Sequence, residues 1–218
     1  MDFSIVITNY NKAPFLDRAV RSCLNQFLLR KKVEVLVVDD CSTDESKTIL
    51  KEYEESIKIV ELSSNKGVAY ASNVGLERSQ APYWMRVDAD DFLSAEACSH
   101  MGAVLDSNPE YDFVYCDHVR VDLRGLRQDH VRLDSDRKLF AHGAGILFRK
   151  DRLAEIGGYD ENLKNAEDYD LLLRLKKTGS KGFYLPVPLY RYYIHGANMT
   201  LSDERSLYWE KVNKKHGI

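Results

Sequence analysis

Three groups of acidic residues could do chemistry, and each of them borders an apolar run. They are Asp39-Asp40 after VEVLVV, Asp88-Ala89-Asp90-Asp91 after YWMRV, and Glu167-Asp168-Tyr169-Asp170 before LLLRL. Carboxylates bind hard divalent cations through oxygen, accept hydrogen bonds from N–H groups and take protons from hydroxyls. The sequence therefore points to cation binding, ligand recognition and general-base chemistry.

The group from Asp88 to Asp91 is the strongest candidate for a cation site. Three acids within four residues repel one another unless a positive charge lies between them, and Mg²⁺ or Mn²⁺ would also keep open positions for phosphate oxygens. A calcium loop begins in the same way, but it needs Gly and Glu where this chain has Leu93 and Ser99. Asp91 could also cap the following helix, so the choice between Asp90 and Asp91 as metal ligand stays open here.

Asp39 and Asp40 follow a run that is typical of a buried parallel strand, and such strands end at the ligand crevice of open α/β sheets. One carboxylate could accept from a ring N–H of a base and the other from loop amides. Alternatively, Asp39 only caps the following turn.

The acids at Glu167–Asp170 precede a helical pattern, where the helix dipole stabilises acids whatever their function. Three acids in this place, apart from the cation candidates, also predict a base that takes a proton from a hydroxyl. Displacement with inversion needs such a base on the face opposite the leaving group.

Several smaller features are open to a functional or a structural interpretation. Lys66-Gly67 could meet a phosphate or a base, or be a surface lysine before a helix-starting glycine. His195 and Arg191 could reach a diphosphate or a metal, or be structural. Gly143 and Gly145 predict close backbone approach, either to a sugar or to a neighbouring strand.

Apolar runs and helical spacings alternate along the first half of the chain. The expected strands are residues 3–8, 33–38, 57–62, 83–87, 113–121 and 183–193, and the expected helices are residues 15–27, 45–55, 67–79, 94–107 and 167–177. Pro14 lies near a helix start, and Ser42 and Asp44 are expected to cap the helix at 45–55. This alternation predicts an α/β fold with a mainly parallel sheet flanked by helices.

The 218 residues suit a single domain, with residues 1–121 as a nucleotide-binding half and 122–218 as an acceptor-side half. Residues 122–138 are expected to be a flexible acceptor-side loop and residues 144–148 a short apolar segment. No internal repeat or low-complexity linker divides the chain.

Composition excludes several classes of protein. A net charge of −3 gives no general attraction to nucleic acid, so no nucleic-acid partner is expected. The cysteines Cys23, Cys41, Cys98 and Cys116 lack CxxC spacing, which favours buried, reduced thiols and a cytoplasmic location over a zinc site.

No segment predicts a secretory signal or a span of about 20 apolar residues, so membrane contact is expected to be peripheral at most, at the inner face of the membrane. Lys211, Lys214 and Lys215 could touch anionic lipid or simply form a solvated helix end.

Seven segments together resemble the family 2 inverting glycosyltransferases of the GT-A fold. They are SIVITNYN, VVDDCSTDES, NKGVAYASNVGL, VDADD, GGYDENL, EDYDLLLRL and YRYYIHGANMT. Their order and spacing match over nearly the whole chain, whereas one D-x-D alone would be weak. The extra C-terminal domain or membrane helices of many relatives are not expected in this chain.

The resemblance implies roles for individual residues. Thr8, Asn9, Tyr10, Asp40, Lys66, Gly67, Asp88 and Ala89 would line the nucleotide site, with Asp40 bonding the base. Asp88 and Asp90, with His195, would hold Mg²⁺ or Mn²⁺ at the donor diphosphate. Asp168 would be the catalytic base and Glu167 would shape its pocket. The donor would be a nucleotide sugar, with UDP favoured, and the acceptor a carbohydrate or a lipid-linked saccharide.

Two other classes of protein are alternatives to a glycosyltransferase. A sugar-1-phosphate nucleotidyltransferase would need a glycine-rich loop after the first strand, where this chain has Asn9-Tyr10-Asn11-Lys12. A non-catalytic nucleotide-sugar-binding module would not need Asp168. Metal-dependent release of nucleoside diphosphate would separate such a module from an enzyme.

Overall fold

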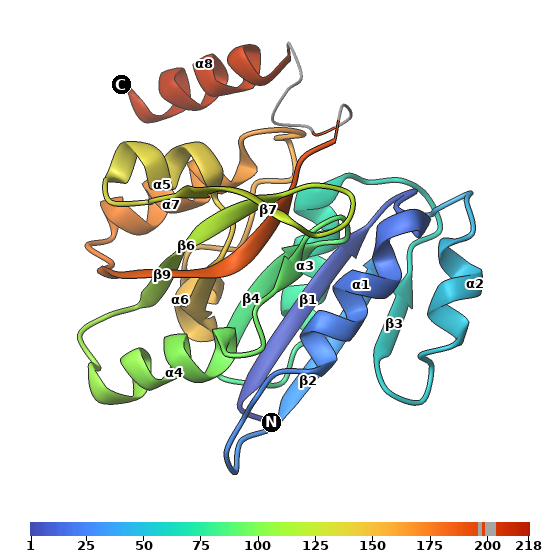
Figure 1. Cartoon of the computed structure of the whole chain (residues 1–218). Helices are drawn as coiled ribbons and strands as arrows, with labels where there is room; N and C mark the ends of the chain where they lie inside the picture. The colour runs from blue at the N-terminus through green and yellow to red at the C-terminus, as the bar shows by residue number, and fades with distance from the viewer. Residues whose placement is uncertain (196–197, 199–203) are drawn as a thin grey trace.

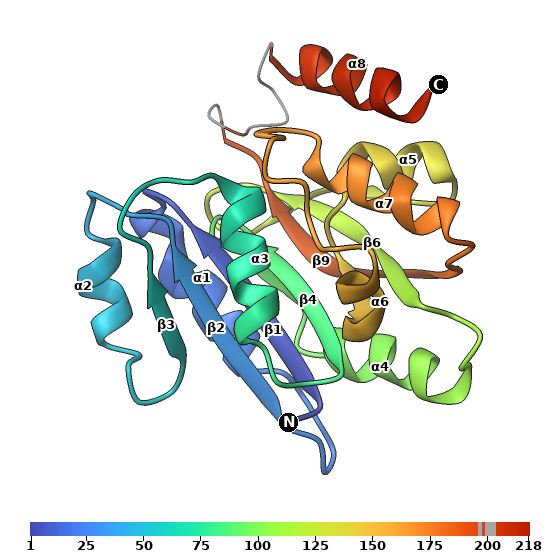
Figure 2. The ribbon, with the colours of Figure 1, turned by 180° about the vertical axis from the view of Figure 1, so that it is seen from behind.

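The computed structural model describes residues 1–195, 198 and 204–218, and in this part of the chain one mixed sheet lies between two layers of helices (Figures 1 and 2). The strand order is β3-β2-β1-β4-β8-β6-β9-β5, and β7 pairs with β6 off this path. Both faces of the sheet are therefore covered, as the continuous apolar runs of its central strands require.

The first half of the sheet is parallel. It consists of β1 (Phe3–Asn9), β2 (Val33–Asp39), β3 (Lys58–Glu61) and β4 (Tyr83–Asp88). Thr8 of β1 lies in register with Asp88 of β4, and Asn9 lies in register with Asp39 of β2. The carboxyl ends of the neighbouring strands β2, β1 and β4 thus meet at one edge of the sheet. The acids Asp39-Asp40 and Asp88–Asp91 lie at this edge.

Four helices cover this half of the sheet on both faces. They are α1 (Ala13–Leu24), α2 (Ser46–Lys51), α3 (Val68–Arg78) and α4 (Ala97–Ser107). One apolar cluster joins β1, β2 and β4 to α1, α2 and α4, and another joins the opposite faces of those strands to α3. The two views from front and back show α1 and α3 on opposite sides of the sheet (Figures 1 and 2).

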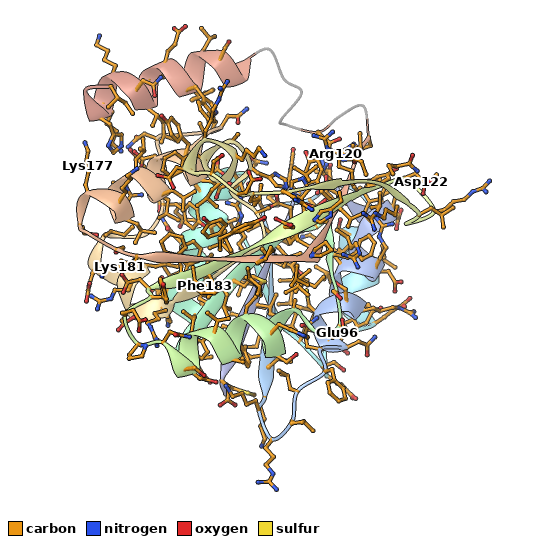
Figure 3. All side chains as sticks on the ribbon, turned by 60° about the vertical axis from the view of Figure 1, so that its left-hand side comes forward. Glu96, Arg120, Asp122, Lys177, Lys181 and Phe183 are labelled. Carbon is orange, nitrogen blue, oxygen red and sulfur yellow. The ribbon has the colours of Figure 1, made fainter. Side chains whose placement is uncertain are left out.

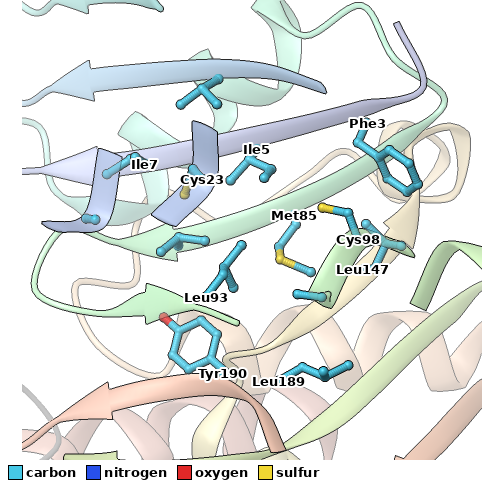
Figure 4. Close-up of a cluster of buried hydrophobic side chains, with 14 of the residues drawn as sticks. Phe3, Ile5, Ile7, Cys23, Met85, Leu93, Cys98, Leu147, Leu189 and Tyr190 are labelled. Carbon is cyan, nitrogen blue, oxygen red and sulfur yellow. The ribbon is translucent and has the colours of Figure 1, made fainter. Parts of the chain in front are cut away.

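The main core is built on one face of β1 and β4. Phe3, Ile5 and Ile7 alternate along β1 and pack with Met85 and with Cys23 of α1 (Figure 4). Every second side chain of these strands is therefore buried in this cluster, and the others are buried on the α3 side. Such double burial fixes the register that sets the positions of the acids.

The second half of the sheet is mostly antiparallel. It contains β5 (Phe92–Leu93), β6 (Phe113–Val121), β7 (Arg127–Val131), β8 (Ile146–Arg149) and β9 (Gly182–Tyr193). β8 runs antiparallel to both β4 and β6, while β6 and β9 are parallel. Figure 3 shows Arg120 and Asp122 at one end of this long β6–β9 pair and Lys181 and Phe183 at the other.

The expectation that residues 122–138 form a loop over their whole length is wrong. Residues Arg127–Val131 form β7 against β6, and α5 (Asp136–His142) begins before the expected loop ends. The sequence of β7 is RQDHV, with its first three residues exposed, so it lacks the apolar alternation that signals a strand.

The remaining helices lie on the α3 side of the sheet. They are α5, α6 (Lys150–Glu155), α7 (Glu167–Lys177) and α8 (Glu204–His216) (Figure 2). α8 packs on α7 through Val212 and through a stack of Trp209 on Tyr169. Lys215 is exposed, as the solvated helix end expected for these lysines requires, and its Nζ also lies 2.7 Å from carboxylate oxygens of Asp160 and Asp170.

Helix starts follow the sequence in part. Pro14 stands in the first turn of α1, as expected. Asp44 does not act as the N-cap residue of α2, but its carboxylate accepts from the amides of Ala13 and Ser46, so it joins the starts of α1 and α2. Ser42 accepts from Asn11 and donates to Asp39, which orders the turn after β2 instead of capping α2.

No helix in the described ranges is long and apolar enough to cross a membrane.

Candidate active site

The carboxyl ends of β1, β2 and β4 open into one cavity of about 550 Å³, which α5, α7 and α8 border on its other side. Its lining includes Thr8, Asn9, Tyr10, Asp40, Lys66, Gly67, Asp88, Ala89, Asp90, Glu167 and Asp168. His195 is outside this lining, but its Nε2 lies 2.8 Å from Oδ2 of Asp90. The structure thus brings the residues that the family resemblance predicts for the site together at a single cavity, with His195 at its edge through Asp90.

Arg191 is not part of this group. It lies in β9 opposite Phe92, and its guanidinium donates to the carbonyl of Pro188. The expectation that Arg191 could reach a diphosphate or a metal is wrong, because the pairing of β9 with β5 turns this residue away from the cavity.

The two acids after β2 have separate tasks. Asp39 is fully buried and accepts from the side chain of Asn9 and from the amide and hydroxyl of Ser42. It is therefore the turn-capping residue of the pair. Asp40 lines the cavity, and its oxygens accept from the amides of Lys66 at 2.7 Å and Gly67 at 2.8 Å.

The pairing of Asp40 with the Lys66–Gly67 loop fixes that loop at the cavity edge. A carboxylate has about four acceptor positions, so Asp40 keeps capacity for a further donor after accepting two amides. Gly67 precedes α3 with φ of +91°, a conformation that L side chains rarely adopt. Gly67 is thus required by the backbone of the loop that brings two amides to Asp40.

The three acids at the end of β4, Asp88, Asp90 and Asp91, point in different directions. Asp88 has a side chain that is 36 % exposed, and its Oδ1 lies 3.4 Å from the hydroxyl of Thr8. Asp90 is nearly buried, and its Oδ2 accepts from Lys12 Nζ at 2.6 Å as well as from His195. Burial would raise the pKa of Asp90, but Lys12 and His195 outweigh it and lower that pKa.

Asp91 faces away from the cavity. It is buried, and its oxygens accept from the hydroxyl of Tyr190 at 2.8 Å and the amide of Tyr193 at 2.9 Å. Burial, and next the charge of Asp90, raises the pKa of Asp91 well above its usual value. α4 begins later, at Ala97, so Asp91 does not cap it. Of the two candidate ligands, it is therefore Asp90 that reaches the cavity.

The first turn of α7 presents Glu167 and Asp168 to the cavity, directly after Ala166, whose φ is +67°. Both acids pair with Arg86 of β4, at 3.0 Å from Glu167 and 2.8 Å from Asp168. Burial raises the pKa of Asp168 well above its usual value and Arg86 opposes this shift, while Glu167 and Asp88 add to it. Asp168 is therefore a stronger proton acceptor than an ordinary aspartate.

Asp170 completes the acidic group but has a structural role. It is fully buried and pairs with Arg174, Lys215 and His216, which ties the end of α8 to α7. These ion pairs give Asp170 a structural role and keep it out of the chemistry of the cavity.

Arg86 and Lys12 are the main cationic residues of the site that sequence reasoning missed. Arg86 is the only cationic residue of β4 and stands two residues before Asp88, so the alternation of a strand puts both on one face. That pattern could have identified Arg86. Lys12 lies in the turn before α1, and nothing in the sequence connects it with Asp90.

An aromatic wall on the other side of the cavity was also missed. It comprises Phe140, His142, Tyr169, Tyr192 and Trp209, which come from α5, α7, β9 and α8. Tyr169 and Trp209 stack with ring centroids 4.1 Å apart. Residues from four separate elements share no spacing in the sequence, so no pattern could have found this wall.

The two glycines near His142 pack against other elements. A Cβ on Gly143 would lie 2.3 Å from Cβ of Asp168, and one on Gly145 would lie 3.1 Å from Cys116 Sγ. Gly145 therefore allows close approach to neighbouring strands and not to a sugar, as one of the two alternatives expected. Gly143 leaves space for the side chain of Asp168 at the start of α7.

The residues around Asp90 suit a divalent cation by type. Carboxylates of Asp88 and Asp90 and the imidazole of His195 are ligands that Mn²⁺ accepts, and the carboxylates also suit Mg²⁺. Within the described ranges, however, no three His, Cys, Asp or Glu residues are grouped closely enough to hold a metal. The ammonium of Lys12 lies against Asp90, so a cation there would compete with it.

Both the sequence and the fold of the chain are similar to those of known proteins. The model of the Glycosyl transferase family 2 matches residues 4–157. An uncharacterized glycosyltransferase of Haemophilus influenzae is 29 % identical over 187 residues, which cover 81 % of this chain and 63 % of that protein. The poly(ribitol-phosphate) beta-N-acetylglucosaminyltransferase TarS of Staphylococcus aureus is 28 % identical over 77 % of this chain and 31 % of its own length.

Solved structures give the same result for the fold. A fragment of S. aureus TarS in complex with UDP superimposes with a TM-score of 0.74 at 25 % identity, covering 89 % of this chain and 61 % of that one. The mannosyltransferase PcManGT from Pyrobaculum calidifontis, in complex with GDP-Man and Mn²⁺, gives a TM-score of 0.70 at 19 % identity over 98 % of this chain and 61 % of its own.

The chain spans less than two thirds of the length of these relatives. The family model nevertheless covers well over half of this chain, and the fold agrees with it. The chain therefore belongs to glycosyl transferase family 2 and has the GT-A fold.

Proposed function

We propose that the protein transfers a sugar from a nucleoside diphosphate sugar, with UDP as the nucleotide, to an acceptor hydroxyl and inverts the anomeric carbon. Asp168 takes the acceptor proton, and Asp88, Asp90 and His195 hold Mg²⁺ or Mn²⁺. In this proposal the whole chain is one transferase domain, in which residues 1–121 bind the donor and residues 122–218 the acceptor.

One observation carries the proposal: Asp168 shares a single cavity with Asp88 and Asp90 while coming from the other half of the chain. An inverting displacement needs a leaving-group side and a base side facing one reaction centre. The cavity volume of about 550 Å³ lies within the range of small-molecule sites. The raised pKa of Asp168 favours its use as the base.

The charges at the cavity support a metal-dependent reaction. Five carboxylates and four cationic side chains line it in the described part of the chain: Asp40, Asp88, Asp90, Glu167 and Asp168 against Lys12, Lys66, Arg86 and Lys164. A diphosphate would add negative charge to this lining. A bound divalent cation would offset the charge that develops on the departing diphosphate.

The donor side has groups suited to a nucleotide. Asp40 keeps acceptor capacity for a ring N–H of the base, beside the fixed Lys66–Gly67 amides. Tyr10 lines the cavity with 45 % of its surface exposed, and an exposed aromatic ring can stack on a base. The related TarS is solved with UDP and with UDP-GlcNAc, so UDP-GlcNAc is the first donor to test here.

The acceptor side is suited to a carbohydrate or a lipid-linked saccharide. The aromatic wall offers apolar faces, and His142 and Lys164 add polar groups to the same side. Aromatic rings with a few polar neighbours are typical of small-molecule sites. We infer a cytoplasmic location for the protein, at most with peripheral contact at the inner face of the membrane.

The test is release of UDP from UDP-GlcNAc with Mn²⁺ and a panel of saccharide acceptors, whose hydroxyl forms the new bond to the anomeric carbon as UDP leaves, measured for the wild type and for Asp168→Asn. The variant should be about 10²- to 10⁴-fold slower, because it lacks the base, and should bind UDP unchanged in calorimetry. Asp90→Ala should instead weaken Mn²⁺-dependent UDP binding. Binding of UDP sugars without any release of UDP would favour a non-catalytic nucleotide-sugar-binding module, and wild-type turnover in Asp168→Asn would refute the base.

A further inference from the structure

Arg86 is a buried arginine whose three guanidinium nitrogens each face a different carboxylate. Its side chain is 8 % exposed. Nη2 lies 2.8 Å from Oδ2 of Asp168, Nη1 lies 3.0 Å from Oε1 of Glu167, and Nε lies 3.4 Å from Oδ1 of Asp88. One side chain of β4 therefore connects its own strand end with the first turn of α7, about 80 residues further along the chain.

The guanidinium is itself held in place from other directions. Its Cζ lies 5.3 Å from the centre of the Tyr159 ring, and Nη1 lies 3.4 Å from the hydroxyl of Ser72 in α3. The backbone of Arg86 is paired with Val6 in the middle of the sheet. A planar fork that packs on an aromatic ring has little freedom to turn, so the carboxylates that bind it are fixed as well.

We propose that Arg86 is a positioning residue for the transfer: it fixes Asp168 through Oδ2, leaves Oδ1 for the acceptor hydroxyl, and ties Asp88 of the donor side to the same group. This inference rests on the proposed function and deepens it, because it names the residue that links the donor side to the base.

The charge of Arg86 also explains why three acids can lie together in a mostly buried place. Without a cation, neighbouring carboxylates raise one another's pKa or move apart. A lysine would supply the charge at one point, whereas the arginine fork supplies directed donors to several acids at once. Removing the fork should therefore displace Asp168 even where the fold is retained.

The experiment compares Arg86→Gln with the wild type in UDP release from UDP-GlcNAc with Mn²⁺, and in calorimetric binding of UDP with Mn²⁺. A displacement of a catalytic group by about 1 Å can cost on the order of 10²-fold in rate. We expect a loss of about that size in kcat and a smaller loss of UDP affinity, because Arg86 also faces Asp88 on the donor side. A wild-type kcat in folded Arg86→Gln would overturn the inference.

A double variant separates positioning from a general structural effect. Because Arg86 acts through Asp168, adding Arg86→Gln to Asp168→Asn should change the remaining rate by less than about twofold. Full multiplication of the two losses would mean that Arg86 acts independently of Asp168, and would also overturn the inference.

Arg149 provides the matched control for loss of an arginine from the sheet. It lies in β8 over the ring of Tyr83 and donates to the carbonyls of Leu105 and Tyr111, away from the cavity. Arg149→Gln should lower the melting temperature and keep the wild-type kcat. An equal loss of kcat in Arg149→Gln would show that loss of any such arginine slows the enzyme, and the inference would fail.

Arg86→Lys gives the same test if Arg86→Gln does not fold. It keeps a positive charge but cannot form the fork, so we expect roughly tenfold slower release with unchanged UDP affinity. A wild-type rate would overturn the inference. If the wild type releases no UDP from any nucleotide sugar, the proposed function fails and the inference falls with it, whereas an active wild type with an equally active Arg86→Lys refutes the inference alone.

Discussion

At the scale of single residues, Asp168 combines burial with one strong cationic partner. Its pKa is raised well above the usual value, and a base works only in its ionised form. The rate of UDP release should therefore be full above this raised pKa and fall as the pH drops through it. We expect the acidic limb of the kcat profile well above pH 4, close to which an ordinary aspartate titrates.

This profile is measured with UDP-GlcNAc and Mn²⁺, with UDP binding followed over the same pH range as the control. If UDP binding fell with pH in parallel with kcat, the acidic limb of the profile would arise from the donor site and not from Asp168. A limb below pH 4 would contradict the raised pKa of the base.

Gly143 is a residue whose replacement should act on Asp168 directly. Its φ is +65°, and a Cβ there would lie 2.6 Å from Oδ2 of Asp168. Gly143→Ala should therefore move the carboxylate off Arg86 and slow UDP release at least tenfold. The backbone strain of an alanine in this conformation costs on the order of 1 kcal/mol in stability.

A substitution at Gly157 is the control that separates the contact with Asp168 from the backbone strain of an alanine at positive φ. Its φ is +77°, and a Cβ would meet nothing within 4 Å. Gly157→Ala should lower the free energy of unfolding to a similar extent and leave kcat unchanged. Equal kcat values in the two variants would show that Gly143 does not determine the position of Asp168.

The residues of the site divide into those that a sequence pattern can reveal and those that it cannot. Asp40, Asp88 and Asp90 follow apolar strands, so the rule for parallel sheets predicts where they meet. Lys12 and Trp209 reach the cavity only through tertiary packing. Asp90 faces the cavity and Asp91 faces the interior because their side chains point in different directions after β4. The spacing of the two residues in the sequence does not predict these directions.

At the scale of elements, Glu34 joins the strand ends opposite the site. Its side chain is 2 % exposed, pairs with Lys58 of β3 at 2.8 Å, and accepts from the hydroxyl of Ser4 and the amide of Gln80. Burial would raise the pKa of Glu34, but Lys58, Ser4 and Gln80 outweigh it and lower that pKa. The ionised side chain therefore stabilises the fold above the ordinary glutamate pKa.

Glu34→Gln should lower the free energy of unfolding at pH 7 by about 1–3 kcal/mol, because buried donors lose a charged acceptor. The difference from the wild type should shrink as the pH falls through the lowered pKa, since the wild-type carboxylate is then protonated too. Urea denaturation at several pH values measures it. Glu61→Gln, which removes a half-exposed pair with Lys47, should change stability by less than about 1 kcal/mol.

The two halves of the sheet differ in how far the sequence predicts them. The strands β1, β2 and β4 are mostly apolar because both faces are covered, and their expected bounds agree with the structure to within one residue. β7 has one exposed polar side and α6 has only six residues, so neither gives a clear period. Their formation depends on the partner strands and not on local preference.

At the scale of the whole molecule, the cavity draws its lining from both halves of the chain. A ligand that binds only the folded state raises its stability by about 2.7 kcal/mol at a concentration of 100 times Kd. For a chain of this size, that corresponds to an increase in Tm of roughly 5–10 °C. UDP with Mn²⁺ should produce such a shift in a thermal denaturation experiment.

Asp90→Ala is the control for this shift. The variant should lose most of the Mn²⁺-dependent part of it, while Asp168→Asn should keep it, because the base lies outside the proposed donor site. The same shift in Asp90→Ala as in the wild type would argue against Asp90 as the metal ligand.

The four cysteines of the chain, all within its described part, offer a practical consequence. Cys23, Cys98 and Cys116 are buried, and burial raises the pKa of Cys23 and of Cys116 to about 12, so these thiols stay protonated and shielded. Cys41 is partly exposed and follows Asp40 directly. Maleimide coupling to the natural protein should thus attach a single dye beside the loop of Lys66 and Gly67, and its fluorescence could follow nucleotide arrival in real time.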